Sequence, residues 1–164
     1  MITAYIGVGT NLERKKHIEA AVVELSQIGE NLRLSPIYEC EAVGFKGKAF
    51  YNLVVEIKTA MELTDFSHAL RNIELKWGRK EDAAKFEPRT LDLDIILFGE
   101  HVSQCKPQIP RDDIYKYIFV IKPLNELCPN LVVPNDGQTI AQIFQQANHS
   151  ESLKEIAPWF SINL

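Results

Sequence analysis

Apolar positions follow two different periods along the chain, and each period predicts one kind of element. Runs rich in branched residues, or strict alternation of apolar and polar positions, predict strands at residues 2–8, 31–39, 52–59 and 91–98. Apolar residues three and four positions apart predict two helices between these strands. The two helical stripes consist of Ile18, Ala21, Val22, Leu25 and Ile28, and of Phe66, Leu70, Ile73 and Trp77.

The order of these elements predicts the fold class. Residues 2–98 follow the order strand, helix, strand, strand, helix, strand, which is typical of a ferredoxin-like, split βαβ antiparallel sheet with both helices on one face. Thr10 and Glu13 match a capping box before the first helix, and Thr64 is expected to cap the second. A short third helix is predicted at residues 139–147. Without a linker or internal repeat in the sequence, we expect an α/β (α+β) fold in a single domain over residues 1–164.

Size, charge and cysteine content narrow the classes of function. The 164 residues suit one domain, and a net charge of −4 argues against a protein that binds nucleic acid over its whole surface. Cys40, Cys105 and Cys128 are far apart and lack C-x-x-C spacing, so neither a disulfide framework nor a zinc site is indicated. No run approaches the roughly 20 apolar residues of a membrane helix, and the N-terminus has no basic leader before its apolar run. We therefore expect a cytoplasmic protein with no membrane partner.

Two aspartates stand out in the last predicted strand. Asp92 and Asp94 alternate with apolar residues, so they point to the same side of the strand, about 6.6 Å apart along it. Aspartates are costly on an apolar strand unless something pairs with them. Mg²⁺ takes one or two carboxylates and completes its shell with water and substrate phosphates, so the pair indicates a magnesium site. A sheet face exposed to water would explain the same pattern.

Basic residues gather in the segment that leads into this strand. They are Lys76, Arg79, Lys80, Lys85 and Arg89. Beside paired carboxylates, arginines favour a site for a polyphosphate with Mg²⁺, because guanidinium groups bind phosphate oxygens in a fork. Acidic residues interleave with them, so a solvated loop is the other interpretation. The chain contains neither a P-loop nor a G-x-G-x-x-G motif, so a nucleotide would bind by another architecture.

Five short blocks of sequence resemble one family of enzymes. The blocks are Tyr5–Leu12, Phe50–Asn52, Ile73–Leu75 with Gly78–Arg79, Pro88–Ile95, and Pro123–Leu127 with Cys128–Pro129. In their order and near their spacing, over roughly residues 1–147, the chain resembles 6-hydroxymethyl-7,8-dihydropterin pyrophosphokinase. Any one block is weak evidence, whereas five in order are specific.

The resemblance implies an activity and a nucleotide site. The reaction would transfer the β,γ-diphosphate of ATP to the hydroxymethyl oxygen of the pterin and release AMP, as a step of folate biosynthesis. Asp92 and Asp94 would hold two Mg²⁺ ions, with ATP as co-substrate. Arg79 and Arg89 would bind phosphate oxygens as catalytic residues. The nucleotide site would further include Glu74, the Ile95 backbone, Arg111 and Tyr117.

The resemblance also implies a site for the pterin ring. The amide of Asn52 would match the donor and acceptor edge of the ring. Phe50 and Phe119 would stack on its faces, and Cys40 and Val43 would line its edge. Without the resemblance, the two phenylalanines would be interpreted as ordinary core.

Four departures from the family pattern bear on the phosphate contacts. A second loop arginine is replaced by Glu81, and the usual glycine before Pro88 is Glu87, which adds a negative charge. After Pro110 the usual histidine is Arg111, and a downstream arginine is Tyr117. Arg111 could keep or strengthen the phosphate contact, whereas Tyr117 carries no charge. Lys116 would face away on an extended segment. These changes concern affinity for ATP more than the class of reaction.

Other classes of function use the same fold and stay open from the sequence. One is a non-catalytic or weakly active ferredoxin-like domain that binds a pterin or a nucleotide. Another is an RNA-binding module, which would need aromatic residues on the strands and a basic face, where this chain has Asp92 and Asp94. We expect a monomeric enzyme with small-molecule substrates and no nucleic-acid partner.

Overall fold

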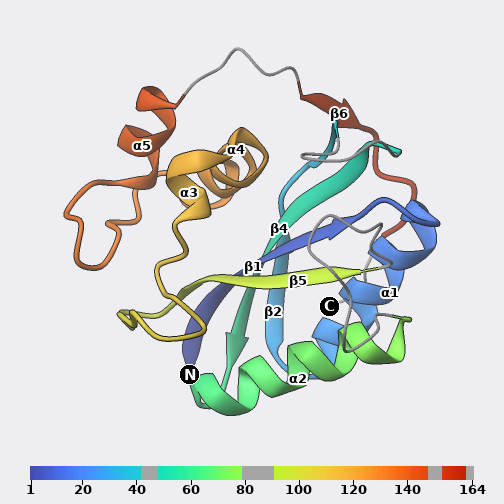
Figure 1. Ribbon diagram of the computed structural model, residues 1–164, viewed down its shortest axis with the longest axis horizontal. Helices are drawn as coiled ribbons and strands as arrows, with labels where there is room; N and C mark the ends of the chain where they lie inside the picture. Colours follow the sequence, from blue (N-terminus) through green and yellow to red (C-terminus); the bar gives the residue numbers. More distant parts are fainter. Residues whose placement is uncertain (42–47, 79–90, 148–152, 162–164) are drawn as a thin grey trace.

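The computed structural model describes residues 1–41, 48–78, 91–147 and 153–161, and these form an antiparallel sheet covered on both faces (Figure 1). The strands in this part of the chain are β1 (Ile2–Thr10), β2 (Glu30–Leu34), β3 (Ile37–Cys40), β4 (Phe50–Thr59), β5 (Asp92–Phe98) and β6 (Lys154–Ile156). They lie in the order β5-β1-β4-β3-β6, and β2 also pairs with β4. The predicted order of elements is thereby confirmed, with β1 and β4 at the centre.

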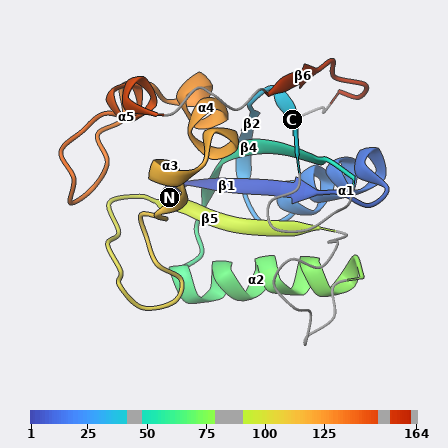
Figure 2. The ribbon, with the colours of Figure 1, turned by 45° about the horizontal axis from the view of Figure 1, so that its top comes forward.

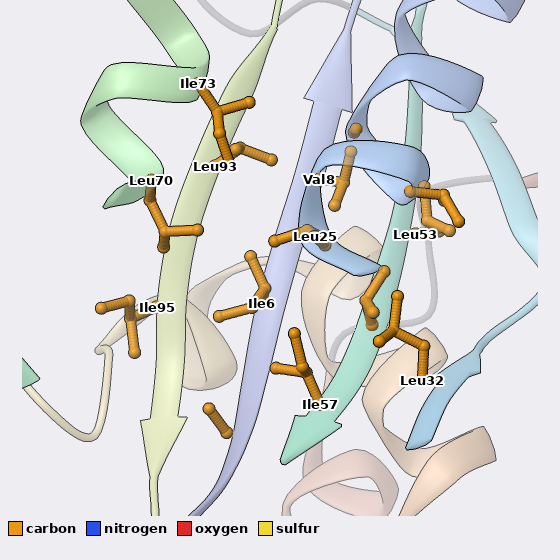
Figure 3. Packing of buried hydrophobic residues seen from close by; sticks show 14 of the residues in the cluster. Ile6, Val8, Leu25, Leu32, Leu53, Ile57, Leu70, Ile73, Leu93 and Ile95 are labelled. Atoms are coloured by element: carbon orange, nitrogen blue, oxygen red, sulfur yellow. The ribbon is translucent and has the colours of Figure 1, made fainter. Parts of the chain in front are cut away.

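Two helices cover one face of the sheet, as the sequence predicts. Helix α1 spans Arg14–Ser26 and helix α2 spans Leu63–Lys76. Their apolar stripes meet the side chains that alternate toward them from the central strands, including Ile6, Leu53 and Leu93 (Figure 3). These residues are buried, and burying such a side chain contributes roughly 1.5–3 kcal/mol. Because Leu93 and Ile95 of β5 point into this half of the core, the alternating residues of the strand point to the opposite face of the sheet.

In the described part of the chain, three further helices cover the opposite face, and only the last of them was predicted, as the helix at residues 139–147. Helix α3 spans Asp113–Lys116, α4 spans Ile118–Leu127 and α5 spans Ile140–Gln146. Figure 2 shows α2 and α4 on opposite sides of the strands. A second buried cluster joins these helices to the sheet through Tyr5, Val54 and Ile96. Helix α4 contains Pro123 in its interior and begins directly after Tyr117, which is extended. Lys116 therefore ends a helix, and the predicted extended segment around it is wrong.

Both predicted helix caps are wrong, and a capping box is present instead at the third predicted helix. Thr10 is the last residue of β1, and α1 begins after Glu13, whose φ of 41° is left-handed. Thr64 lies inside α2, which begins after Glu62. Thr139 caps α5 with a full capping box, in which its Oγ1 accepts from the Gln142 N–H at 3.1 Å.

The single strand predicted at residues 31–39 is divided into β2 and β3 at Ser35 and Pro36. Proline has no N–H to donate to a ladder. At this break Ser35 keeps the chain bonded to β4, because its Oγ accepts from the Val54 N–H at 2.9 Å. On the outer side of β3, β6 pairs with it through residues 37–39.

No helix in the described part of the chain has the length and apolar character needed to cross a membrane.

Candidate active site

A pocket opens where β1, β4 and β5 meet the start of α4. Its described lining consists of Gly7, Val8, Gly9, Asn52, Leu53, Val54, Asp92, Asp94, Ile96, Arg111, Asp113, Phe119 and Val120. Apolar side chains from the sheet and from α4 form its walls, while the polar groups come from β4, from the first half of β5 and from the segment after it. The pocket thus combines an apolar slot with a charged rim, the usual composition of a small-molecule site.

The two aspartates of β5 lie side by side on this face of the sheet. Both line the pocket, as their alternation predicts. Asp92 is paired across the ladder with Gly9, and Asp94 with Gly7. Because those partners lack side chains, other pocket side chains approach the backbone of β1 closely, Ile96 at Gly7 and Asn52 at Gly9.

The pKa of the Asp94 carboxyl group is raised above its usual value. Its side chain is 34% exposed. Burial and the neighbouring charge of Asp92 raise the pKa of Asp94 to about 8, while Arg111 acts in the opposite direction. A divalent cation beside Asp94 would favour its ionised form.

The donor set at these carboxylates suits Mg²⁺. Two carboxylate side chains face one pocket, and the described residues contain no cluster of three or more histidine, cysteine or acidic residues arranged to enclose a metal. Mg²⁺ is commonly held by one or two carboxylates, with phosphates and water in the remaining positions. The residues present therefore fit a metal that enters with a phosphate substrate.

Asn52 lies deep in the pocket, where the register of the sheet fixes its position. It is paired with Gly9 of β1 on one side and with Tyr38 of β3 on the other, and it is only 9% exposed. Its Nδ2 donates to the Cys40 sulfur at 2.9 Å. A Cβ built on Gly9 would lie 2.9 Å from Asn52 Oδ1, so Gly9 leaves the space that this amide occupies. Asn52 and Cys40, predicted to belong to one site, are in contact.

Aromatic rings form one wall near the start of α4. Phe119 lines the pocket. Tyr117 stacks on Phe119, with ring centroids 5.0 Å apart and an interplanar angle of 19°. Tyr117 itself lines a separate hollow with Ile121 and Ala147, and it is not among the described residues that line the pocket. Phe50 begins β4 opposite Cys40, two residues before Asn52.

Arg111 brings a positive charge to the carboxylates. Its Nε donates to Asp113 Oδ2 at 2.8 Å, and its Nη2 lies 3.7 Å from Asp94 Oδ2. Burial acts in the opposite direction, but the charges of Asp94 and Asp113 raise the pKa of Arg111. Lys116, by contrast, pairs with Asp112 at 2.8 Å.

The remaining predicted residues fall in three places. Glu74 of α2 is buried behind β5, where its Oε2 accepts from the Leu93 N–H at 2.8 Å, and it lies 3.6 Å from Arg71. Ile95 is buried in the core between the sheet and α2. Glu74 therefore anchors the strand that carries both aspartates, whereas neither residue is in the described lining of the pocket. Val43, Arg79 and Arg89 lie outside the described residues.

Sequence reasoning missed Asp113 and the apolar wall formed by Val54, Ile96 and Val120. Asp113 follows Arg111 by two residues, which was the available signal for a paired arginine. The apolar wall depends on α4 crossing the sheet, for which the chain offers no local signal.

Comparison with known proteins gives one consistent family. Residues 5–129 match the model of the 7,8-dihydro-6-hydroxymethylpterin-pyrophosphokinase family. Among curated relatives named 2-amino-4-hydroxy-6-hydroxymethyldihydropteridine pyrophosphokinase, that of Aquifex aeolicus is 33% identical over 82% of this chain and 85% of its own. That of Haemophilus influenzae is 35% identical over 91% of this chain and 96% of its own.

Solved structures agree on the fold. The HPPK-DHPS of Plasmodium falciparum, in a crystal structure with pteroate, superposes with a TM-score of 0.69 at 14% identity, covering 88% of this chain. The chain corresponds to 42% of that longer polypeptide.

The family match places this α/β fold, whose pocket combines paired carboxylates and an amide, among the phosphate-transferring enzymes of the kinase class. The chain belongs to the 7,8-dihydro-6-hydroxymethylpterin-pyrophosphokinase family. It is accordingly an ATP-dependent pyrophosphokinase, a transferase of folate biosynthesis.

Proposed function

We propose that this chain transfers the β,γ-diphosphate of ATP to the hydroxymethyl oxygen of 6-hydroxymethyl-7,8-dihydropterin and releases AMP. The hydroxymethyl oxygen forms a bond to Pβ. The bond from Pβ to the oxygen that bridges it to Pα breaks, its electrons leave on AMP, and the hydroxyl proton passes to water. The names of the curated relatives support both the transferred group and the pterin.

The proposal rests on one pocket whose residues suit two different substrates. Asp92 and Asp94 lie in the same pocket as Asn52 and Phe119. The carboxylates suit a phosphate substrate with its metal, and the amide and ring suit a flat heteroaromatic molecule. A reaction that joins a diphosphate to a pterin needs these two recognition sites side by side.

Asp92 and Asp94 would hold two Mg²⁺ ions in this pocket. Bound Mg²⁺ would neutralise charge on the triphosphate and polarise the phosphoryl oxygens. Glu74 holds the Leu93 N–H between the two aspartates, which keeps both carboxylates on one rigid strand. Arg111 lies on the same side as these carboxylates, where its fork can bind phosphate oxygens.

The pterin would lie along the apolar slot. Asn52 uses one N–H on Cys40, which leaves its Oδ1 and its second N–H for the polar edge of the ring. Phe119 would stack on the ring, with Tyr117 supporting it from behind. Positioning both substrates in this way would contribute most of the rate, since phosphoryl transfer needs alignment and charge stabilisation rather than a protein nucleophile.

A product balance tests this function. The purified protein is incubated with Mg-ATP and the hydroxymethyl dihydropterin, and nucleotides and pterins are separated by chromatography. We expect equal amounts of AMP and of the pterin diphosphate. Formation of ADP, or of AMP that does not depend on the pterin, would contradict the proposal.

A further inference from the structure

Arg111 lies beside Asp94, one of the two proposed metal ligands, without being a ligand itself. Its backbone N–H donates to the Ile96 carbonyl at 2.9 Å, and its Nε donates to Asp113 at 2.8 Å. The third contact, from Nη2 to Asp94, is 3.7 Å long. The residue is thus held once through its backbone and once through its side chain, and the side chain is only loosely held at Asp94.

The described lining of the pocket has more acidic than basic side chains. Among its described lining residues, Asp92, Asp94 and Asp113 are acidic and Arg111 is basic. The Arg111 side chain is 36% exposed and lies close to Asp94, a candidate metal ligand. When no substrate is bound, its guanidinium compensates part of this negative charge. A divalent cation arriving alone would meet the same positive charge at short range.

Resting on the proposed function, we infer that Arg111 is a counter-ion that couples metal binding to nucleotide binding. Without nucleotide, the positive charge of Arg111 lies beside Asp94 and weakens the binding of a divalent cation. With nucleotide, its Nη groups turn from Asp94 to a phosphate oxygen, and the cation binds the freed carboxylate.

The geometry allows this exchange without loss of the tether. A guanidinium has five N–H donors, so the Nε bond to Asp113 can persist while the Nη groups change partner. Since coupling is reciprocal, the cation and the nucleotide each increase the affinity of the other by the same factor. Repulsion between a single and a double positive charge a few ångströms apart, screened by water, corresponds to about tenfold in affinity.

Mn²⁺ binding tests the inference without turnover. Mn²⁺ is titrated by electron paramagnetic resonance into the whole protein, alone and with the ATP analogue that carries a methylene bridge between Pα and Pβ. We expect Arg111→Gln to bind Mn²⁺ alone about tenfold more tightly than the unmodified protein. The factor by which the analogue increases Mn²⁺ affinity should fall by a similar amount.

Two further variants separate this inference from the proposed function. Lys116→Gln removes the same charge from a side chain paired with Asp112, and it should leave both Mn²⁺ titrations unchanged. Asp94→Asn should lose Mn²⁺ binding in the presence of the analogue. If Asp94→Asn behaves so while Arg111→Gln matches the unmodified protein, the counter-ion role is wrong and the metal assignment stands. If Asp94→Asn also binds Mn²⁺ normally, both are wrong.

Discussion

Replacing Asp94 with asparagine should change how the stability of the protein depends on pH. Burial and the charge of Asp92 raise the pKa of Asp94 from 3.8 to about 8. In the folded protein this carboxyl therefore keeps its proton over a range in which the unfolded chain has lost it. The folded state binds more protons between about pH 4 and pH 8, so the stability of the protein falls as the pH rises through that window. Asparagine does not titrate, and Asp94→Asn should be free of this loss.

The size of the effect follows from the pKa and the exposure of the side chain. For a carboxyl fully shielded from water, a rise from 3.8 to about 8 would correspond to roughly 5–6 kcal/mol. The Asp94 side chain is 34% exposed, so water and salt screen the repulsion. The contact to Arg111 is also lost in the variant. We therefore expect the stability of Asp94→Asn relative to the unmodified protein to increase by about 1–2 kcal/mol between pH 4 and pH 8.5.

Urea unfolding in the presence of a chelator measures this difference. Unfolding free energies of both proteins are determined at half-unit steps from pH 4 to pH 9. Asp112→Asn is the matched control, since its carboxylate pairs with Lys116 and is not in the described lining of the pocket. A difference between Asp94→Asn and the unmodified protein that stays constant across the whole range would refute the reasoning.

Three further predictions concern the pterin side of the pocket. Asn52→Ala should weaken pterin binding by about 1–3 kcal/mol and nucleotide binding much less, measured by calorimetric titration of each ligand, because the polar edge of the ring loses its partner. Gly9→Ala should also weaken pterin binding, since the new Cβ would lie 2.9 Å from Asn52 Oδ1, whereas Gly7→Ala, 3.3 Å from the end of a flexible side chain, should have a smaller effect on the same titration. Equal losses in these two variants would argue against the close approach. Tyr117→Leu should lower pterin affinity several-fold by removing the stack on Phe119, and an unchanged dissociation constant would show that the stack has no positioning role.

The sheet and its faces could be predicted from the sequence because a period of two is a strong local signal. Leu53, Val55 and Ile57 alternate cleanly, and all three are buried against α1 and α2. The same alternation predicts that Asp92 and Asp94 share one face of β5, and both line the pocket there. Local patterning was sufficient for these two strands, in which one face is buried against the helices.

Helix α4 could not be predicted from its own sequence. Residues 118–121 form a short apolar run, which fits a buried strand as well as a buried helix, and Pro123 disfavours a helix interior. The packing of this segment against β4 and α5 decides its conformation. The position of Phe119, and with it the apolar wall of the pocket, depends on this tertiary packing.

The contacts within the site depend on register rather than on spacing. Asn52 and Cys40 are twelve residues apart, and their hydrogen bond follows from the pairing of β3 with β4. The resemblance to known pyrophosphokinases assigned both residues to the pterin, but it did not predict their contact. Likewise, Arg111 is brought to Asp94 by its backbone bond to Ile96 of β5, which no local pattern shows.

Single-turnover AMP release tests the central role of the carboxylate pair most directly. The unmodified protein, Asp92→Asn, Asp94→Asn and the control Asp112→Asn are each mixed in excess with the hydroxymethyl dihydropterin and limiting Mg-ATP, and AMP is followed with time. Removing one carboxylate should cost several kcal/mol of transition-state stabilisation, so both pocket variants should slow at least about 100-fold. Asp112→Asn should match the unmodified protein. Near-normal rates in folded Asp92→Asn or Asp94→Asn would contradict the account.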